Sequence, residues 1–284
     1  MHAPLVEVVR GGLIESVHFG SVVLLEESGA AAGQLGQTGV DMYPRSTSKL
    51  MQSAGMLELG LAVESAHLAL TASSHSGGDV HVRGVLEILH NHGLSESDLQ
   101  CQPAMPLGAA ERRAYAATGG KPLPIRSDCS GKHAGFLATC VVNGWDTKTY
   151  LEPSHPLQVQ LRKTIEQTTG AASAFETLDG CGAPLWSTTL VGLAQAYRLG
   201  ASGTEGTAMR RVADAMRAFP ELVGGPDREP TEAMLALEGV LAKDGADGVL
   251  AMADPQGRAV ALKVADGGKR PIAAVIASVL RTWG

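Results

Sequence analysis

The segment that decides the fold begins Ser46-Thr47-Ser48-Lys49-Leu50-Met51-Gln52-Ser53-Ala54-Gly55 and continues to Leu70. Its apolar residues recur at three- and four-residue steps, which is typical of a helix. The recurring residues are Leu50, Met51, Met56, Leu57, Leu59, Leu61 and Ala62. Gly55 and Gly60 weaken the pattern and indicate close packing inside the protein. A helix this apolar is normally buried, so we expect Ser46–Leu70 to pack against a sheet.

Strand patterns lie near both ends of the chain. Valine-rich runs cover Leu5–Arg10 and Ser16–Glu26. Near the other end, Gly248–Ala253 and Ala259–Ala265 flank Asp254-Pro255-Gln256-Gly257, which predicts a hairpin turn. Strands at both ends imply a sheet assembled from the two termini.

The middle of the chain has helical patterns. They cover Val82–His92, Lys132–Val142, Pro156–Thr168, Leu190–Leu199, Gly206–Ala218 and Glu232–Leu241, and a last helix covers Ile272–Trp283. The stretch Gly29–Gly39 is predicted to be a loop. We therefore predict a single domain, 1–284, of class α/β (α+β). Its antiparallel sheet comes from about 1–45 and 245–284, and the middle, 46–244, is a helical subdomain. The gap between these layers is the natural place for a site.

Composition limits the function classes. The 284 residues suffice for a substantial core, which small and aliphatic side chains must fill because only 4% are aromatic. A net charge of −6 with scattered lysines and arginines argues against a nucleic-acid partner. No run is long enough to span a membrane, and Met1–Arg10 has no export-signal pattern. We expect a cytoplasmic protein.

Three stretches in a fixed order pair two serines with two lysines. They are Ser46-Thr47-Ser48-Lys49, Ser74-His75-Ser76-Gly77 and Lys263-Val264-Ala265-Asp266-Gly267. Ser46 and Lys49 share a helix face, and the helix start favours a developing oxyanion. A serine is a poor nucleophile until a base such as a desolvated neutral lysine takes its proton. The order S-x-x-K, S-x-[SN], late lysine resembles that of penicillin-interacting serine enzymes.

Each motif taken alone has a plain structural interpretation. Ser46 is also a suitable helix N-cap beside a solvated Lys49. The Ser74 stretch is also a turn sequence. Lys263 interrupts an apolar strand, where it either reaches solvent or is held in a cleft that lowers its pKa. The order of the three motifs favours the functional interpretation.

Two of the four cysteines lie in glycine-framed loops, in Cys129-Ser130-Gly131-Lys132-His133-Ala134-Gly135 and in Asp179-Gly180-Cys181-Gly182. Their thiolates could meet around a zinc ion, with His133 as the conventional third ligand and a neutral Lys132 amine as a rarer one. From the residues alone, two reduced structural thiols are favoured over a metal site.

These segments together resemble the thermolabile, inducible L-asparaginase II family of rhizobial type, the class 3 L-asparaginases. The resemblance rests on Pro44-Arg45-Ser46-Thr47-Ser48-Lys49, Ser74–Gly77, Asp128–Gly135, Asp179–Gly182 and Lys263–Gly267 in that order. It covers nearly the whole chain, and C-S-G-K-H-A-G is its most specific part. Gly224-Gly225-Pro226-Asp227-Arg228-Glu229-Pro230 looks altered relative to the family.

The resemblance implies a fold similar to serine β-lactamases and glutaminases, a homodimer, and L-asparagine as the substrate. It implies two Ser–Lys tandems in one pocket, Ser46 with Lys49 and Ser74 with Lys263. It also places zinc at Cys129, Lys132 and Cys181. Substrate would be held by Arg45, His133 and Asp179.

The expected reaction is hydrolysis of L-asparagine to L-aspartate and ammonia through a serine acyl-enzyme. Ser46, deprotonated by Lys49, would attack, and Ser74 with Lys263 would protonate the leaving ammonia and activate water. A glutaminase is the alternative enzyme, because one substrate methylene is worth only about 1–3 kcal/mol in a pocket. A D-peptidase or β-lactamase is disfavoured, since no export signal or K-[ST]-G triad is found. A non-catalytic ligand-binding relative is the remaining alternative.

Overall fold

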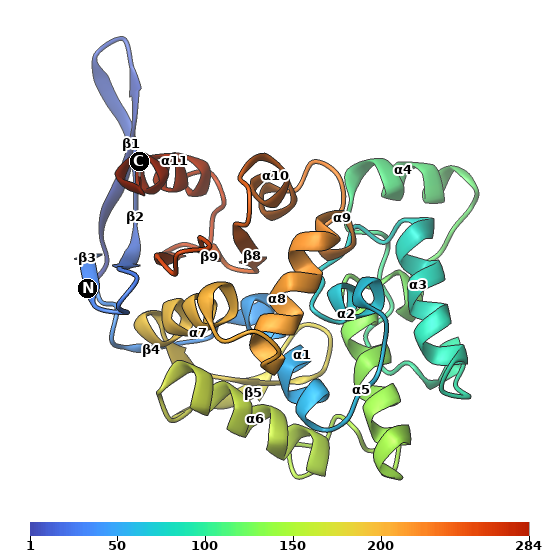
Figure 1. Ribbon diagram of the computed structural model, residues 1–284. Coiled ribbons are helices and arrows are strands. Elements are labelled where there is room, and N and C mark those ends of the chain that lie inside the picture. Colours follow the sequence, from blue (N-terminus) through green and yellow to red (C-terminus); the bar gives the residue numbers. More distant parts are fainter. Residues whose placement is uncertain (284) are drawn as a thin grey trace.

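The computed structural model describes residues 1–283, and its main element is an antiparallel sheet built from both ends of the chain (Figure 1). The strand order is β1-β2-β10-β9-β8, and β3 pairs with the second half of β2. The strands are β1 (Ala3–Arg10), β2 (Leu13–Leu25), β3 (Ala31–Leu35), β8 (Leu241–Gly245), β9 (Val249–Ala253) and β10 (Ala259–Val264). The predicted antiparallel sheet from the two termini is confirmed.

Helices flank this sheet. The helix α7 packs against β2, β9 and β10, while α10 and α11 cover the face that carries Ala242, Leu250 and Met252. The α-helices are α1 (Lys49–Glu58), α2 (Ser65–Thr71), α3 (Asp79–His90), α4 (Ala109–Ala117), α5 (Ser130–Asn143), α6 (Pro156–Thr169), α7 (Leu190–Ser202), α8 (Ala208–Ala218), α9 (Pro220–Val223), α10 (Glu229–Ala236) and α11 (Ile272–Trp283). Short 3₁₀ turns are η1 (Arg45–Ser48), η2 (Glu96–Asp98) and η3 (Pro124–Arg126). Two small sheets join β4 (Asp41–Met42) to β7 (Thr188–Thr189) and β5 (Glu176–Leu178) to β6 (Pro184–Trp186).

The helix predicted over Ser46–Leu70 is divided in two, and glycine geometry explains why. Gly60 has φ +88°, a conformation that side chains disfavour. The amide of Gly60 bonds to the carbonyl of Leu57, and that of Leu61 bonds to the carbonyl of Met56. This pair of bonds is the Schellman motif that ends helices, so α1 stops and α2 begins in a new direction.

Other parts of the structure also differ from the prediction. Gly29–Gly39, expected to be a loop, contains β3, because residues 31–35 pair with the exposed edge of β2. The helix expected over Glu232–Leu241 ends at Ala236, since the chain turns at Gly239 with φ +72° and enters β8. The sheet therefore starts at Leu241, slightly before the predicted 245.

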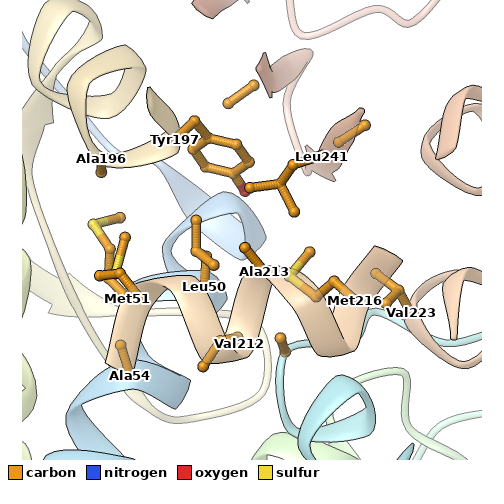
Figure 2. Packing of buried hydrophobic residues seen from close by; sticks show 14 of the residues in the cluster. Leu50, Met51, Ala54, Ala196, Tyr197, Val212, Ala213, Met216, Val223 and Leu241 are labelled. Carbon is orange, nitrogen blue, oxygen red and sulfur yellow. The ribbon is translucent and has the colours of Figure 1, made fainter. Parts of the chain in front are cut away.

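The buried core joins the helical middle to the sheet. Figure 2 shows Leu50 and Met51 of α1 packing with Tyr197 of α7, Ala213 of α8 and Leu241 of β8. The hydroxyl of Tyr197 donates to the carbonyl of Thr47 at 3.0 Å. This bond fixes the turn before α1 to the core, so the Ser46 segment is held rigidly beside the sheet.

Within residues 1–283, no helix is both long enough and apolar enough to cross a lipid bilayer.

Candidate functional site

The turn that carries Ser46 is strained on its N-terminal side. Arg45 has φ +53°, although it is not a glycine. Such conformations cost about 1–3 kcal/mol and persist where the surrounding structure imposes them, often at functional sites. Ser46 follows in η1 and is half-buried, and α1 begins three residues later at Lys49. The local geometry thus presents Ser46 at the start of a helix, as predicted.

Lys49 lies at the centre of a buried polar cluster and is 1% exposed. Its amine donates to the Ser74 hydroxyl at 3.0 Å, to the Ser73 carbonyl at 2.6 Å and to the Cys129 sulfur at 3.1 Å. An ammonium group has three N–H donors, and these acceptors satisfy all three. The Lys49 amine therefore holds the Ser74 hydroxyl in place.

Backbone bonds fix the Ser74 segment from two sides. The amide of Ser74 donates to the Val223 carbonyl at 2.9 Å, and the amide of His75 donates to the Asp128 carbonyl at 3.1 Å. The ring of His75 also bonds through Nε2 to the hydroxyl of Ser130 at 2.9 Å. These contacts place Ser74 between α9 and the start of α5, where the cysteine segment begins.

A second buried lysine, Lys243, is the residue that sequence reasoning missed. It lies on β8 and is 0% exposed. Gly245 is two residues further on, so it faces the same side of the strand. A Cβ at Gly245 would lie 2.9 Å from the Pro44 carbonyl oxygen and 3.3 Å from the Arg45 Cβ. Lys243 therefore belongs to the face of β8 that packs against the Ser46 turn.

The bonds of Lys243 differ from those of Lys49. Its amine donates to the Asp244 carbonyl at 2.7 Å and to the Asp244 carboxylate at 2.8 Å. The Asp244 carboxylate forms an ion pair with Lys243 when the amine is protonated, and the same two acceptors would suffice for the two N–H groups of the neutral amine. Burial lowers the pKa of Lys243 to about 8, against the opposing charge of Asp244 and with help from nearby Lys49. Lys243 is thus a buried amine that loses its proton more readily than an ordinary exposed lysine.

A sequence signal for Lys243 existed. Lys243-Asp244-Gly245 has the K-x-G form of the K-T-G element that accompanies S-x-x-K in related serine enzymes. It was missed because Asp244 occupies the position usually held by a hydroxyl residue. The helix predicted up to Leu241 also left no room for a strand there.

Lys263 does not contact Ser74 through any hydrogen bond described within residues 1–283. Its amine donates to the carbonyls of Asp247, at 2.5 Å, and Val264, at 2.8 Å. In the sheet, Lys263 pairs with Val249, which pairs with Gly245. Both β8 and β9 contact the Ser46 turn, so Lys263 on β10 lies next to a strand that contacts this turn. The hydrogen bonds of Lys263 described within residues 1–283 therefore do not include the Ser74 partner that the sequence predicted.

Arg45 lies in the turn that carries Ser46 and forms two ion pairs. Its guanidinium donates to Asp179 at 2.8 Å and also pairs with Asp247. Asp179 lies in the 179–183 turn between β5 and β6, and that turn also carries Cys181. Burial lowers the pKa of Lys263, and nearby Arg45 adds to the effect. The predicted residues Arg45 and Asp179 are therefore in direct contact.

The predicted cysteine cluster is also assembled. Lys132, in the first turn of α5, donates to the Cys181 sulfur at 3.1 Å. Cys129 is the N-cap of the same helix and hydrogen-bonds to Cys181. Gly131 makes this approach possible, since a Cβ there would lie 2.3 Å from the Leu70 carbonyl oxygen. Two thiols and an amine therefore converge beside Lys49 and Ser74.

The two thiols differ in proton affinity. The hydrogen bond from Cys129 and the charge of Lys132 hold the pKa of Cys181 far below its ordinary value. The same bond and burial raise the pKa of Cys129. Burial acts to lower the pKa of Lys132, but Cys181 and Cys129 raise it overall. Cys181 and Lys132 are thus in contact, and this proximity lowers the pKa of Cys181 and raises that of Lys132.

His133 is buried against this cluster. Its Nδ1 bonds to the Tyr150 hydroxyl at 2.8 Å, while its Nε2 is buried without a hydrogen-bond partner and faces Cys181. Residues 1–283 contain no preassembled group of three or more His, Cys, Asp or Glu side chains that would hold a metal. The two sulfurs, the amine of Lys132 and the unpartnered His133 nitrogen nevertheless form a donor set of the kind that zinc accepts.

Comparison with known proteins identifies one sequence family and several solved structures of low sequence identity. The sequence model of the family described as L-asparaginase II matches residues 6–284. No curated protein sequence matches the chain.

Three solved structures illustrate the fold similarity. Mglu in its native form has 15% identity and a TM-score of 0.46, covering 90% of this chain and 59% of that chain. A β-lactamase from Mycobacterium bovis has 13% identity and a TM-score of 0.44, covering 88% of each chain. A Bacillus glutaminase has 12% identity and a TM-score of 0.42, covering 93% of this chain and 90% of that chain. At TM-scores this low, no functional conclusion follows from them.

Proposed function

Because the chain belongs to the L-asparaginase II family, we propose that it is an amidohydrolase that converts L-asparagine to L-aspartate and ammonia. The observation that carries this proposal is the buried Lys49–Ser74 contact of 3.0 Å. It lies beside the helix start at Ser46 and beside a second buried amine, Lys243. Two hydroxyls and two buried amines provide the nucleophile and the proton-transfer groups that a serine acyl-transfer site requires.

The first chemical step is attack by the Ser46 oxygen on the side-chain amide carbon. Lys243, rather than the predicted Lys49, takes the Ser46 proton, since its bonding leaves a lone pair free and its pKa is about 8. Backbone N–H groups at the start of the Ser46 helix receive the oxyanion. Ser74 gives a proton to the departing nitrogen and regains one from the Lys49 ammonium. Ammonia leaves, and an ester on Ser46 remains.

Hydrolysis of the ester reverses these proton movements. Water attacks the ester carbon, and its proton passes through Ser74 to the neutral Lys49. The Ser46 oxygen leaves the carbonyl and takes back a proton from Lys243. Aspartate is released, and both lysines return to their starting states, so the cycle is balanced. Arg45, oriented by Asp179, binds the substrate carboxylate at the mouth.

Zinc is proposed at Cys129, Lys132 and Cys181, with the His133 nitrogen as a further donor. When bound, the ion would supply a fixed positive charge beside the site. Cys129 also orients the catalytic groups directly. Its sulfur accepts a hydrogen bond from Lys49 and so fixes the amine that holds Ser74. Assembly as a homodimer and residence in the cytoplasm stay predictions.

Ammonia release tests the proposal. We expect the wild type to release ammonia from asparagine, and Ser46→Ala to lower kcat by about 10⁴-fold or more. Ser74→Ala should lower kcat by roughly 10²–10⁴-fold, because a proton relay is lost. Ser97→Ala, at an exposed turn, is the matched control with unchanged turnover. Full activity in Ser46→Ala would contradict the proposal, and faster turnover of glutamine than of asparagine would favour a glutaminase.

Metal content tests the zinc proposal separately. We expect about one zinc ion per wild-type chain by elemental mass spectrometry, since three or four protein donors suffice for one tetrahedral ion. Cys181→Ser should lose that zinc, whereas Cys140→Ser, in the apolar part of α5, should keep it. Equal zinc in all three proteins would place the metal elsewhere.

A further inference from the structure

Asp244 is a buried carboxylate approached by three basic side chains. Lys243 donates to Oδ1 at 2.8 Å, Arg228 donates to Oδ2 at 2.7 Å, and Lys269 approaches Oδ2 at 3.3 Å. The Asp244 side chain is 7% exposed and that of Arg228 is 13% exposed. Both carboxylate oxygens of Asp244 therefore accept hydrogen bonds, and its negative charge is partly balanced by Arg228 and Lys269.

Arg228 also reaches the other half of the site. Its second guanidinium nitrogen donates to the Ser74 carbonyl at 3.4 Å. Hydrogen bonds thus run from Lys243 through Asp244 and Arg228 to the backbone of Ser74. The cross-link joins β8, which faces the Ser46 turn, to the loop that carries the second serine.

The segment that contains Arg228 is pressed against the serine loop. The hydroxyl of Ser76 donates to the Gly224 carbonyl at 2.8 Å. A Cβ at Gly225 would lie only 1.9 Å from the Ser76 hydroxyl oxygen, and Gly225 has φ +106°. Residues 224–230 therefore lie directly against the loop that carries Ser74.

We propose that Asp244 and Arg228 are a positioning pair for the proton-accepting amine. Asp244 occupies the two N–H groups of Lys243 and so directs its lone pair, while Arg228 compensates the Asp244 charge and ties the pair to Ser74. The proposal rests on the proposed function, in which Lys243 is the base.

The electrostatic consequence has a definite sign. The charged groups around the Lys243 amine are Asp244 on the same strand, Lys49 of α1, Arg228 before α10, and Lys269, which approaches through Asp244. Asp244 raises the pKa of Lys243, and Arg228 and Lys49 lower it. Loss of Arg228 must therefore raise the pKa of Lys243, and loss of the Asp244 charge must lower it further.

Opposite shifts in two variants test the proposal. The acid limb of the kcat/KM profile should move to higher pH by about 1 unit in Arg228→Gln and to lower pH in Asp244→Asn. Both should lower the limiting kcat with little change in KM. Arg228→Lys should keep the limb near its wild-type position because the charge is retained. Arg10→Gln, in an exposed ion pair of the β1–β2 hairpin, is the control with an unchanged profile.

A second readout separates this proposal from the proposed function. Selective ¹³C-lysine NMR measures the pKa of Lys243 directly, without turnover, in the wild type and in both variants. The Lys243 signal is assigned by its loss in Lys243→Arg. Opposite shifts by NMR in a protein that hydrolyses no amide would support the pair and refute the proposed function. Lower kcat in both variants, with the limb and the NMR midpoint both unmoved, would overturn the positioning pair and leave amide hydrolysis intact.

Discussion

Lys243→Ala lowers kcat/KM for asparagine by about 10²–10⁴-fold, the range typical for loss of a general base, whereas Lys263→Ala lowers it by less than about tenfold. The difference follows from position. Lys243 is fully buried on the face of β8 that packs against the Ser46 turn, and Lys263 bonds to the carbonyls of Asp247 and Val264. The measurement is ammonia release by both variants beside the wild type.

The pH profile gives this prediction a second part. Because Lys243 must be neutral to accept a proton, wild-type kcat/KM should rise as pH increases through about 8. In Lys243→Ala that limb should disappear, while in Lys263→Ala it should remain. A larger loss of kcat/KM in Lys263→Ala than in Lys243→Ala would contradict this assignment. It would support the Ser74–Lys263 tandem that the sequence predicted.

Gly131→Ala lowers the free energy of unfolding by about 1–3 kcal/mol, the usual cost of overpacking. On an exposed helix the same change would add about 1 kcal/mol of stability. Here the new Cβ would meet the Leu70 carbonyl oxygen at 2.3 Å, and backbone cannot move aside cheaply. The clash separates α5 from the end of α2, so Cys129 should also move away from Lys49.

Chemical denaturation measures this effect. The control is Gly39→Ala, because a Cβ at Gly39 meets no atom within 4 Å and the residue has no positive φ. We expect the control to unfold within about 0.5 kcal/mol of the wild type, as surface substitutions usually do. A Gly131→Ala protein as stable as the control would show that the two helices are free to adjust.

The sequence predicted much of the architecture because its signals are local. Valine-rich runs at both ends indicated strands, and the Asp254–Gly257 turn lies between β9 and β10 as expected. Helix boundaries failed where backbone geometry decides. The Schellman motif at Gly60 divides the predicted helix, and β3 forms only because β2 offers it an unpaired edge.

For the candidate site, the sequence by itself predicted which side chains would take part. Ser46, Lys49, Ser74, Cys129, Lys132 and Cys181 were all identified from their motifs, and most of them are in contact. Tertiary structure alone decided which amines lie near which hydroxyls. Lys49 contacts Ser74, and Lys243 lies on the face of β8 that packs against the Ser46 turn. A motif fixes spacing along the chain, whereas the proton affinity of an amine depends on burial and on charges that only folding brings within a few ångströms.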